Sequence, residues 1–155
     1  MLRFPYQDEP LIGPAPPSMP RGATVRRRPL VPDEVIGPGG VSCHFSRAVV
    51  DPAADDTIFT LDTASLIGLP LLPDTGHRIV WRGQLHPLRF GKVELVLTDG
   101  ITVLRWPAMV GFSPAKLRCP LLGQAGCLQY IDAFFQGWAE AVELEPNHSY
   151  PGTVT

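Results

Sequence analysis

The residues of this sequence best suited to chemistry are three acids in one short segment, Asp51, Asp55 and Asp56. Asp51 follows Val49 and Val50, two β-branched residues typical of a strand, and therefore stands where a strand would end. Two carboxylates held close together share one proton, because like charges at that distance cannot both ionise. The ionised member can activate a water molecule while the protonated member polarises a carbonyl group. Such a pair titrates as a unit and could hydrolyse a peptide bond.

The segment 49–59 resembles the active-site strand and loop of retropepsin-like aspartic proteases. In that family two apolar residues precede Asp-Thr-Gly-Ala or Asp-Thr-Gly-Ser, and the continuation Ala54-Asp55-Asp56-Thr57-Ile58 fits it. Leu121-Leu122-Gly123 resembles the family's apolar-apolar-Gly element, which lies against the catalytic loop. The segment 81–84 falls where the family has a substrate-covering flap, and 63–69 resembles the Leu-Gly-apolar segment of bacterial members. The resemblance covers roughly residues 23–145.

The resemblance implies a mostly β fold, an acid-protease-like closed β-barrel formed as a single lobe with one short helix and a flap hairpin. It implies an aspartic endopeptidase that cleaves a peptide or protein substrate without a cofactor or metal. One lobe carries one motif, so the second acid must come from a homodimer partner. The residues it implies are the catalytic Asp51, the substrate-binding Ala53, Asp55, Asp56, Trp81 and Gly83, and the loop-supporting Leu122 and Gly123.

Two residues depart from the family pattern, because Pro52 and Ala53 replace Thr and Gly. The family Thr links the two catalytic loops through its hydroxyl group, whereas Pro52 has neither a hydroxyl nor a backbone N–H. Ala53 keeps its N–H but adds a methyl group and restricts the backbone. Gln124 stands where many members have Arg. An alternative function is therefore a catalytically inactive pseudoprotease, or a dimeric peptide-binding module on the same fold.

A second segment, Leu61-Asp62-Thr63-Ala64-Ser65, also resembles the motif, with only its Gly changed to Ala. The residues that follow it leave little room for the structure that normally comes after the loop, so we favour Asp51. A purely structural interpretation also exists for each acid: Asp62 as a helix N-cap, Asp51 as a turn residue before Pro52, and Asp55 and Asp56 as Asx-turn residues. A third possibility is an unrelated small β-barrel protein in which the motif is a coincidence.

The composition sets limits on the whole chain. Its 155 residues, 45% of them hydrophobic, suffice for one core, and 18 Pro and 15 Gly favour a turn-rich β protein. A net charge of −2 gives no strong field for nucleic acid or a membrane surface, and no segment has the roughly 20 apolar residues that span a bilayer. Three cysteines without a paired motif, and no apolar leader, predict a cytoplasmic protein with reduced thiols. The four histidines are dispersed and predict no metal site.

Patterning divides the chain into a Pro-rich flexible arm (1–22), the retropepsin-like domain (23–145) and a C-terminal tail (146–155). Within the domain we expect strands at 23–36 and 41–50, a helix within 59–69, and the arms of a hairpin at 75–80 and 85–98 with Gly83 at its tip. Asp99-Gly100 predicts a tight turn into a returning strand at 101–111. A mixed helical turn and strand at 126–135 and a last strand at 141–144 complete the prediction. Arg26-Arg27-Arg28 is interpreted as a solvated strand edge.

Overall fold

Six strands close into a β-barrel in the computed structural model, which describes residues 1–155. In order around the barrel they are β10 (Val103–Ser113), β6 (Ile58–Thr60), β11 (Leu121–Leu122), β5 (Ser42–Val50), β4 (Leu30–Ile36) and β9 (Arg89–Thr98). The pairing of β9 with β10 closes the ring, and the short β14 (Thr153–Val154) extends the sheet beside β10. The predicted mostly β fold, a closed single-lobe barrel with one short helix, is confirmed.

The longest pairing in the barrel is the hairpin of β9 and β10. Its register runs from Thr98 opposite Val103 to Arg89 opposite Phe112. Asp99 shapes the turn, since its carboxylate accepts hydrogen bonds from the backbone N–H groups of Ile101 and Thr102. Gly100 supplies the left-handed backbone, with φ of 90°. The Asp99-Gly100 pair therefore sets the register, as the sequence predicts.

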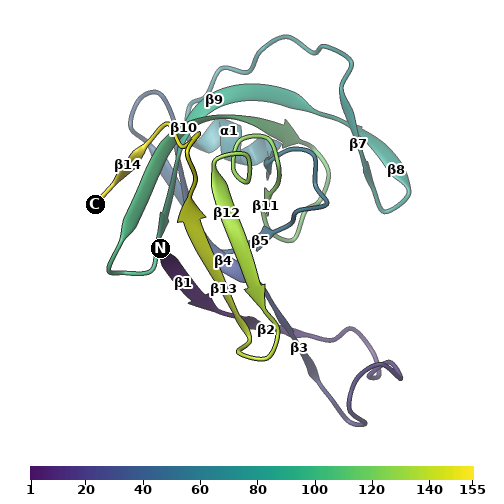
Figure 1. Cartoon of the computed structure of the whole chain (residues 1–155). Helices are drawn as coiled ribbons and strands as arrows, with labels where there is room; N and C mark the ends of the chain where they lie inside the picture. Colours follow the sequence, from purple (N-terminus) through teal and green to yellow (C-terminus); the bar gives the residue numbers. More distant parts are fainter.

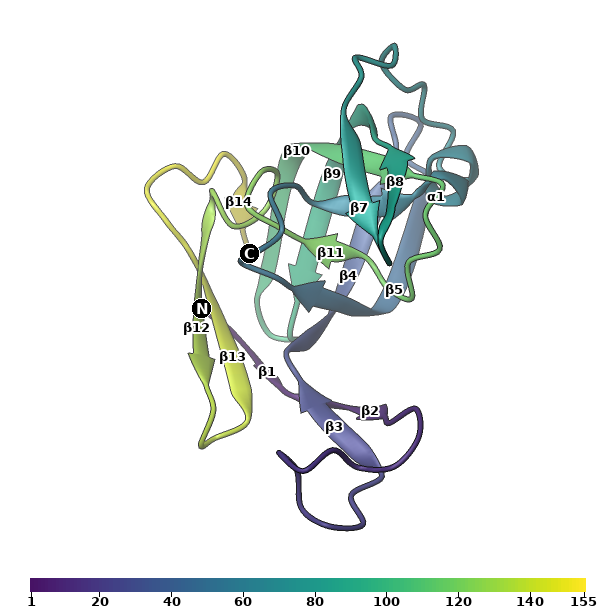
Figure 2. The ribbon, with the colours of Figure 1, turned by 90° about the vertical axis from the view of Figure 1, so that its right-hand side faces the viewer.

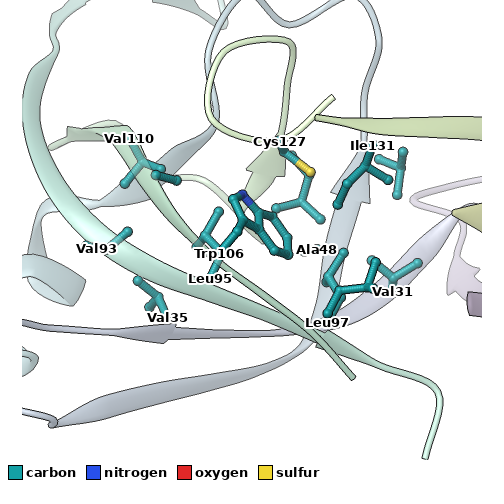
Figure 3. Close-up of a cluster of buried hydrophobic side chains, with 14 of the residues drawn as sticks. Val31, Val35, Ala48, Val93, Leu95, Leu97, Trp106, Val110, Cys127 and Ile131 are labelled. Atoms are coloured by element: carbon teal, nitrogen blue, oxygen red, sulfur yellow. The ribbon is translucent and has the colours of Figure 1, made fainter. Parts of the chain in front are cut away.

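The core fills the barrel and continues beneath a second sheet. Trp106 is fully buried at its centre, and its indole N–H donates a 2.8 Å hydrogen bond to the Gly126 carbonyl oxygen. Figure 3 shows Trp106 surrounded by aliphatic side chains of β4, β9 and β10 and by Cys127. A buried indole with its N–H satisfied combines a large apolar area with no polar cost.

The second sheet has three strands in the order β1 (Leu2–Pro5), β13 (Ala141–Pro146) and β12 (Ile131–Gln136). We expected a flexible arm at 1–22, but Leu2 and Phe4 are buried in the main core. Their alternation with exposed Arg3 and Pro5 is that of a half-buried strand. The prolines do not prevent pairing, because Pro5 and Pro10 stand at the ends of their strands.

A long two-stranded arm projects away from the barrel, as Figures 1 and 2 show. It pairs β2 (Gln7–Pro10) with β3 (Val25–Arg28), and the loop 11–24 forms its end. The predicted basic edge lies on β3. Two of its three cations have acidic partners: Arg28 contacts Glu9, and Arg27 contacts Asp8 and Glu140.

The single helix, α1 (Leu61–Leu66), follows β6 directly and buries Thr63, Ala64 and Ile67 against the barrel. Thr60 is its N-cap residue, so Asp62 lies in the first turn and not at the N-cap that the structural interpretation gave it. The helix is only six residues long, so it lacks the length and the apolar run that crossing a bilayer requires. A hairpin of β7 (Arg78–Trp81) and β8 (Gln84–Pro87) stands apart as its own two-stranded sheet.

Candidate functional site

The candidate site is built where β11 lies between β5 and β6. Leu121 and Leu122 pair in parallel with Val49 and Val50 of β5, and Leu121 pairs on its other side with Ile58 of β6. The loop 51–57 joins β5 to β6 and must therefore pass over the end of β11. The order of pairing thus places Asp51 and Gly123 side by side, although they are far apart in the sequence.

Gly123 lies directly beneath the loop. A Cβ atom at this position would come within 2.3 Å of the Asp56 carbonyl oxygen and 2.7 Å of the Ala54 carbonyl oxygen, closer than real contacts allow. Its N–H donates to the Thr57 hydroxyl at 3.2 Å, and Leu122 is fully buried. The two residues predicted to support the loop therefore contact it, and only glycine fits at 123.

Asp51 is half-buried at the end of β5. Its N–H donates to the Leu122 carbonyl oxygen at 3.1 Å, which continues the β5–β11 ladder by one residue. One carboxylate oxygen, Oδ1, accepts a 3.0 Å hydrogen bond from the Ala53 N–H. No group of the protein bonds to Oδ2, so one oxygen is fixed in orientation and the other can accept a proton or a water molecule.

Pro52, one of the two residues that differ from the family pattern, accepts a contact that the sequence does not reveal. The Gln124 side-chain amide donates a 2.9 Å hydrogen bond to the Pro52 carbonyl oxygen, and its backbone N–H donates to the Ala54 carbonyl oxygen at 2.9 Å. Gln124 therefore holds the loop from both its side chain and its backbone. Within one chain, this contact fixes Pro52 although Pro52 itself can donate no hydrogen bond.

The other loop acids lie on the outer side. Asp55 is exposed, and its carbonyl oxygen accepts the Ala125 N–H at 2.9 Å. Asp56 is partly buried, and burial together with the nearby charge of Asp55 raises its pKa, while His77 opposes the shift. Ala53 is exposed beside them, and Asp62 lies on the exposed side of α1.

The hairpin predicted to be a flap approaches Asp51. Figure 2 shows β7 and β8 in front of the barrel wall formed by β5 and β11. Its turn has left-handed backbone at Arg82 (φ 50°) and Gly83 (φ 77°), which is the geometry of a tight two-residue hairpin turn. Trp81 and Arg82 line a cavity of about 350 Å³ with Asp51, Val49 and Leu121. Gly83, Ala53, Asp55 and Asp56 do not line it, so the structure brings only Trp81 together with Asp51 there.

Four more residues complete this cavity, and the sequence analysis did not place them in a site. They are Glu9, Arg28, Arg118 and Cys119. Arg118 and Cys119 immediately precede the Leu121-Leu122-Gly123 element, so the segment that supports the loop also carries these two residues to it. That adjacency is the signal that could have indicated them. A larger hollow of about 650 Å³ lies within the loop 11–24, but it is lined by no acid or histidine.

The electrostatics of the cavity are dominated by arginine. The hydrogen bond from Arg28, at 2.9 Å, lowers the pKa of Glu9 against the opposing effect of burial, and the charges of Arg118 and Arg47 act in the same direction as Arg28. Burial raises the pKa of the Cys119 thiol, so Cys119 is protonated at neutral pH and is no thiolate nucleophile. The structure contains no group of three His, Cys, Asp or Glu side chains arranged to hold a metal ion.

Comparisons of this chain with known protein families, with curated proteins and with solved structures gave no match. The arrangement around Asp51 is thus interpreted from its own geometry: a strand-end carboxylate with one free oxygen, a supported loop, and a hairpin that shares its cavity.

Proposed function

We propose that this protein is an aspartic endopeptidase of the retropepsin type, which hydrolyses peptide bonds as a homodimer. The observation that carries the proposal is the position of Asp51. It stands at the end of β5 beside β11, over Gly123, and it lines one cavity with Trp81 and Arg82 of the hairpin. These groups come from three separate segments of the chain. Their convergence on one carboxylate supports a site more strongly than the short sequence motif does.

The proposed chemistry needs a second copy of the chain. Asp51 of each copy would form the pair that shares one proton. The ionised carboxylate takes a proton from a water molecule as the water oxygen attacks the peptide carbonyl carbon, and the protonated carboxyl gives its proton to the carbonyl oxygen. Collapse of the tetrahedral species breaks the C–N bond: the leaving nitrogen receives a proton from the pair, and one hydroxyl group of the tetrahedral species returns a proton to the pair as the new carboxyl group forms. The β7–β8 hairpin would cover the peptide and exclude water.

The same geometry supports a second candidate, a pseudoprotease or peptide-binding module. Pro52 and Ala53 favour it, because Pro52 brings neither hydroxyl nor N–H to a loop-to-loop contact between copies. Against it stands the bond from Gln124 to Pro52, which fixes the loop within each chain. For either candidate, a reducing compartment such as the cytoplasm suits the three free cysteines.

The test is cleavage of a mixed peptide library by the wild type and by Asp51→Asn, from about pH 3 to pH 7, where a carboxylate pair sharing a proton works. We expect cleavage by the wild type alone, with both proteins equally folded by circular dichroism. Asp62→Asn is the matched control, since it makes the same change at the other motif-like acid, and it should cleave as the wild type does.

The two candidates give different results in this experiment. Cleavage that survives in Asp51→Asn would refute the assignment of Asp51 as the catalytic acid. If neither protein cleaves at any pH while both are folded, the endopeptidase is rejected in favour of the peptide-binding module.

A further inference from the structure

We propose that the cavity beside Asp51 contains a subsite for a carboxylate side chain of a bound peptide, formed by Arg82 and Arg118. This inference rests on the proposed peptide site and names the class of peptide that it takes: one with Glu or Asp close to the bond presented to Asp51. It applies equally to a peptide that is cleaved and to one that is only bound.

The charges that line the cavity are unbalanced. Three guanidinium groups, those of Arg28, Arg82 and Arg118, face two carboxylates, those of Glu9 and Asp51. Glu9 forms an ion pair with Arg28 at 2.9 Å. Neither Arg82 nor Arg118 forms an ion pair or a side-chain hydrogen bond with any group of the protein, whereas Arg3, Arg27, Arg28, Arg78 and Arg105 all have acidic partners. Two arginines without partners in one cavity suit an anionic ligand group.

The two arginines are carried by two different segments of the chain. Arg82 sits in the left-handed turn of the β7–β8 hairpin, where its backbone conformation is set by pairing of Trp81 with Gln84. Arg118 lies just before Pro120, whose carbonyl oxygen accepts the Val49 N–H at 2.9 Å and ties the segment to β5. One cation thus comes from the hairpin and one from the barrel, so a carboxylate between them would also link the hairpin to the barrel.

Trp81, which also lines the cavity, has an indole N–H that is buried without a hydrogen bond, an arrangement that costs free energy. That N–H is closed off from solvent, so the groups that the cavity offers to a ligand are the two cations and, as a free acceptor, the Oδ2 atom of Asp51.

The test measures binding to the full-length Asp51→Asn variant, in which no cleavage can interfere. The probes are acetylated, amidated octapeptides with a central Leu-Phe pair, in which Glu or Gln occupies one other position at a time. Isothermal titration calorimetry should show that, for at least one position, the Glu peptide binds about five- to tenfold more tightly than the Gln peptide. This preference should weaken as salt is added, because both arginines are exposed.

Added substitutions assign the preference to the two arginines. In the same background, Arg82→Gln and Arg118→Gln should each reduce it, and together they should remove it, so that the Glu and Gln peptides of each pair bind equally. Arg21→Gln is the matched control. It removes an arginine that also lacks an ion pair but lies in the loop 11–24, outside this cavity, and the preference should persist.

Equal binding of every Glu and Gln pair, or a preference that survives the double substitution, would overturn the subsite. Cleavage of the same peptides by the wild type is scored separately. A Glu preference in binding that depends on the arginines, without cleavage at any pH, would keep the subsite and reject the endopeptidase. Cleavage that is indifferent to Glu would keep the endopeptidase and reject the subsite.

Discussion

Asp33 is an acid enclosed within the core of the barrel. It lies on β4 at the point where the register with β5 shifts, and it is almost completely buried. Neither carboxylate oxygen accepts a hydrogen bond of normal geometry, although the neighbouring Glu34 N–H favours the charged form. Burial raises the pKa of Asp33 to about 8. At neutral pH the folded protein therefore holds Asp33 protonated.

This raised pKa predicts that the protein loses stability as the pH rises. Between about pH 4 and pH 8 the unfolded chain has Asp33 ionised while the folded chain keeps it protonated, so the folded state binds one more proton. The contribution of Asp33 to the unfolding free energy should fall by about 1.4 kcal/mol per pH unit over this range and then level off. Denaturant unfolding at several pH values should show that Asp33→Asn removes this slope and stabilises the protein at pH 8.

Asp99 provides a control for that experiment, because its pKa is shifted in the opposite direction to that of Asp33. Backbone hydrogen bonds from Thr102 and Ile101 lower its pKa, so its stabilising effect is present at neutral pH and is lost as the pH falls through the folded pKa. Asp99→Asn should therefore cost stability at neutral pH and little in acid. Equal pH dependence of wild type and Asp33→Asn would show that Asp33 is hydrated or paired in solution.

The support that Gly123 gives to the loop 51–57 can be tested by adding one methyl group. Gly123→Ala places a Cβ against two backbone oxygens that cannot rotate away, so we expect a loss of about 1–3 kcal/mol in the unfolding free energy. Gly39→Ala is the matched control, because nothing lies within 4 Å of its Cβ position and its φ is not positive. Equal stability of the two variants, measured by urea unfolding, would mean that the loop does not rest on Gly123.

Among the secondary-structure elements, the sequence predicts those features that depend on residues close together in the chain. The Asp99-Gly100 turn, the strand ending at Val50 and the helix within 59–69 depend on neighbouring residues, and each is present. The strands β1 and β2 differ from the flexible arm that the sequence predicts, because a high proline content argues against strand pairing. Their partners, β13 and β3, lie elsewhere in the chain.

In the candidate site, too, some features follow from neighbouring residues and others depend on contacts between distant segments. The strand-end position of Asp51 and the support from Leu122-Gly123 follow from short motifs, whereas the arginines do not. Arg82 and Arg118 reach one cavity only because the hairpin folds over β11. No spacing along the sequence indicates that these two arginines line the same cavity. The burial of Asp33 escaped prediction for a similar reason, since a single acid in a strand pattern is normally placed on the exposed face.

The β7–β8 hairpin is the element that we expect to open most easily. Its two strands pair only with each other, and Val80 and Leu85 at its tip are exposed, so little buried apolar area holds it against the barrel. In native-state hydrogen exchange, amides of this hairpin should exchange much faster than those of β9 and β10. A bound peptide should slow them.

The matched comparison for this measurement is β1, an edge strand outside the barrel, none of whose residues lines the cavity. A bound peptide that slowed exchange equally in β7–β8 and in β1 would indicate general stabilisation. Exchange in β7–β8 as slow as in the barrel would contradict the expectation that the hairpin is a mobile cover.

On the scale of the whole molecule, the three-stranded sheet leaves an edge open. β12 pairs with β13 on one side only, and it carries the exposed side chains of Phe134 and Phe135. Trp138, in the turn after it, is 92% exposed. An unpaired strand edge with exposed aromatic residues is suited to binding another chain. The segment between Gly123 and β12 is tied to the loop support, since the Leu128 N–H donates to the Gly123 carbonyl oxygen.

The homodimer that the proposed chemistry requires should therefore depend on this edge. Trp138→Ser should shift sedimentation from dimer to monomer at micromolar concentration and reduce cleavage in proportion, because each monomer supplies only one Asp51. Ile101→Ser is the matched control: Ile101 is 90% exposed in the β9–β10 turn and belongs neither to β12 nor to the turn after it, so its loss should leave the dimer intact. A wild type that sediments as a monomer at every concentration would contradict the homodimer. Since one chain contributes a single motif acid, it would also leave the site without its second carboxylate and favour the peptide-binding module.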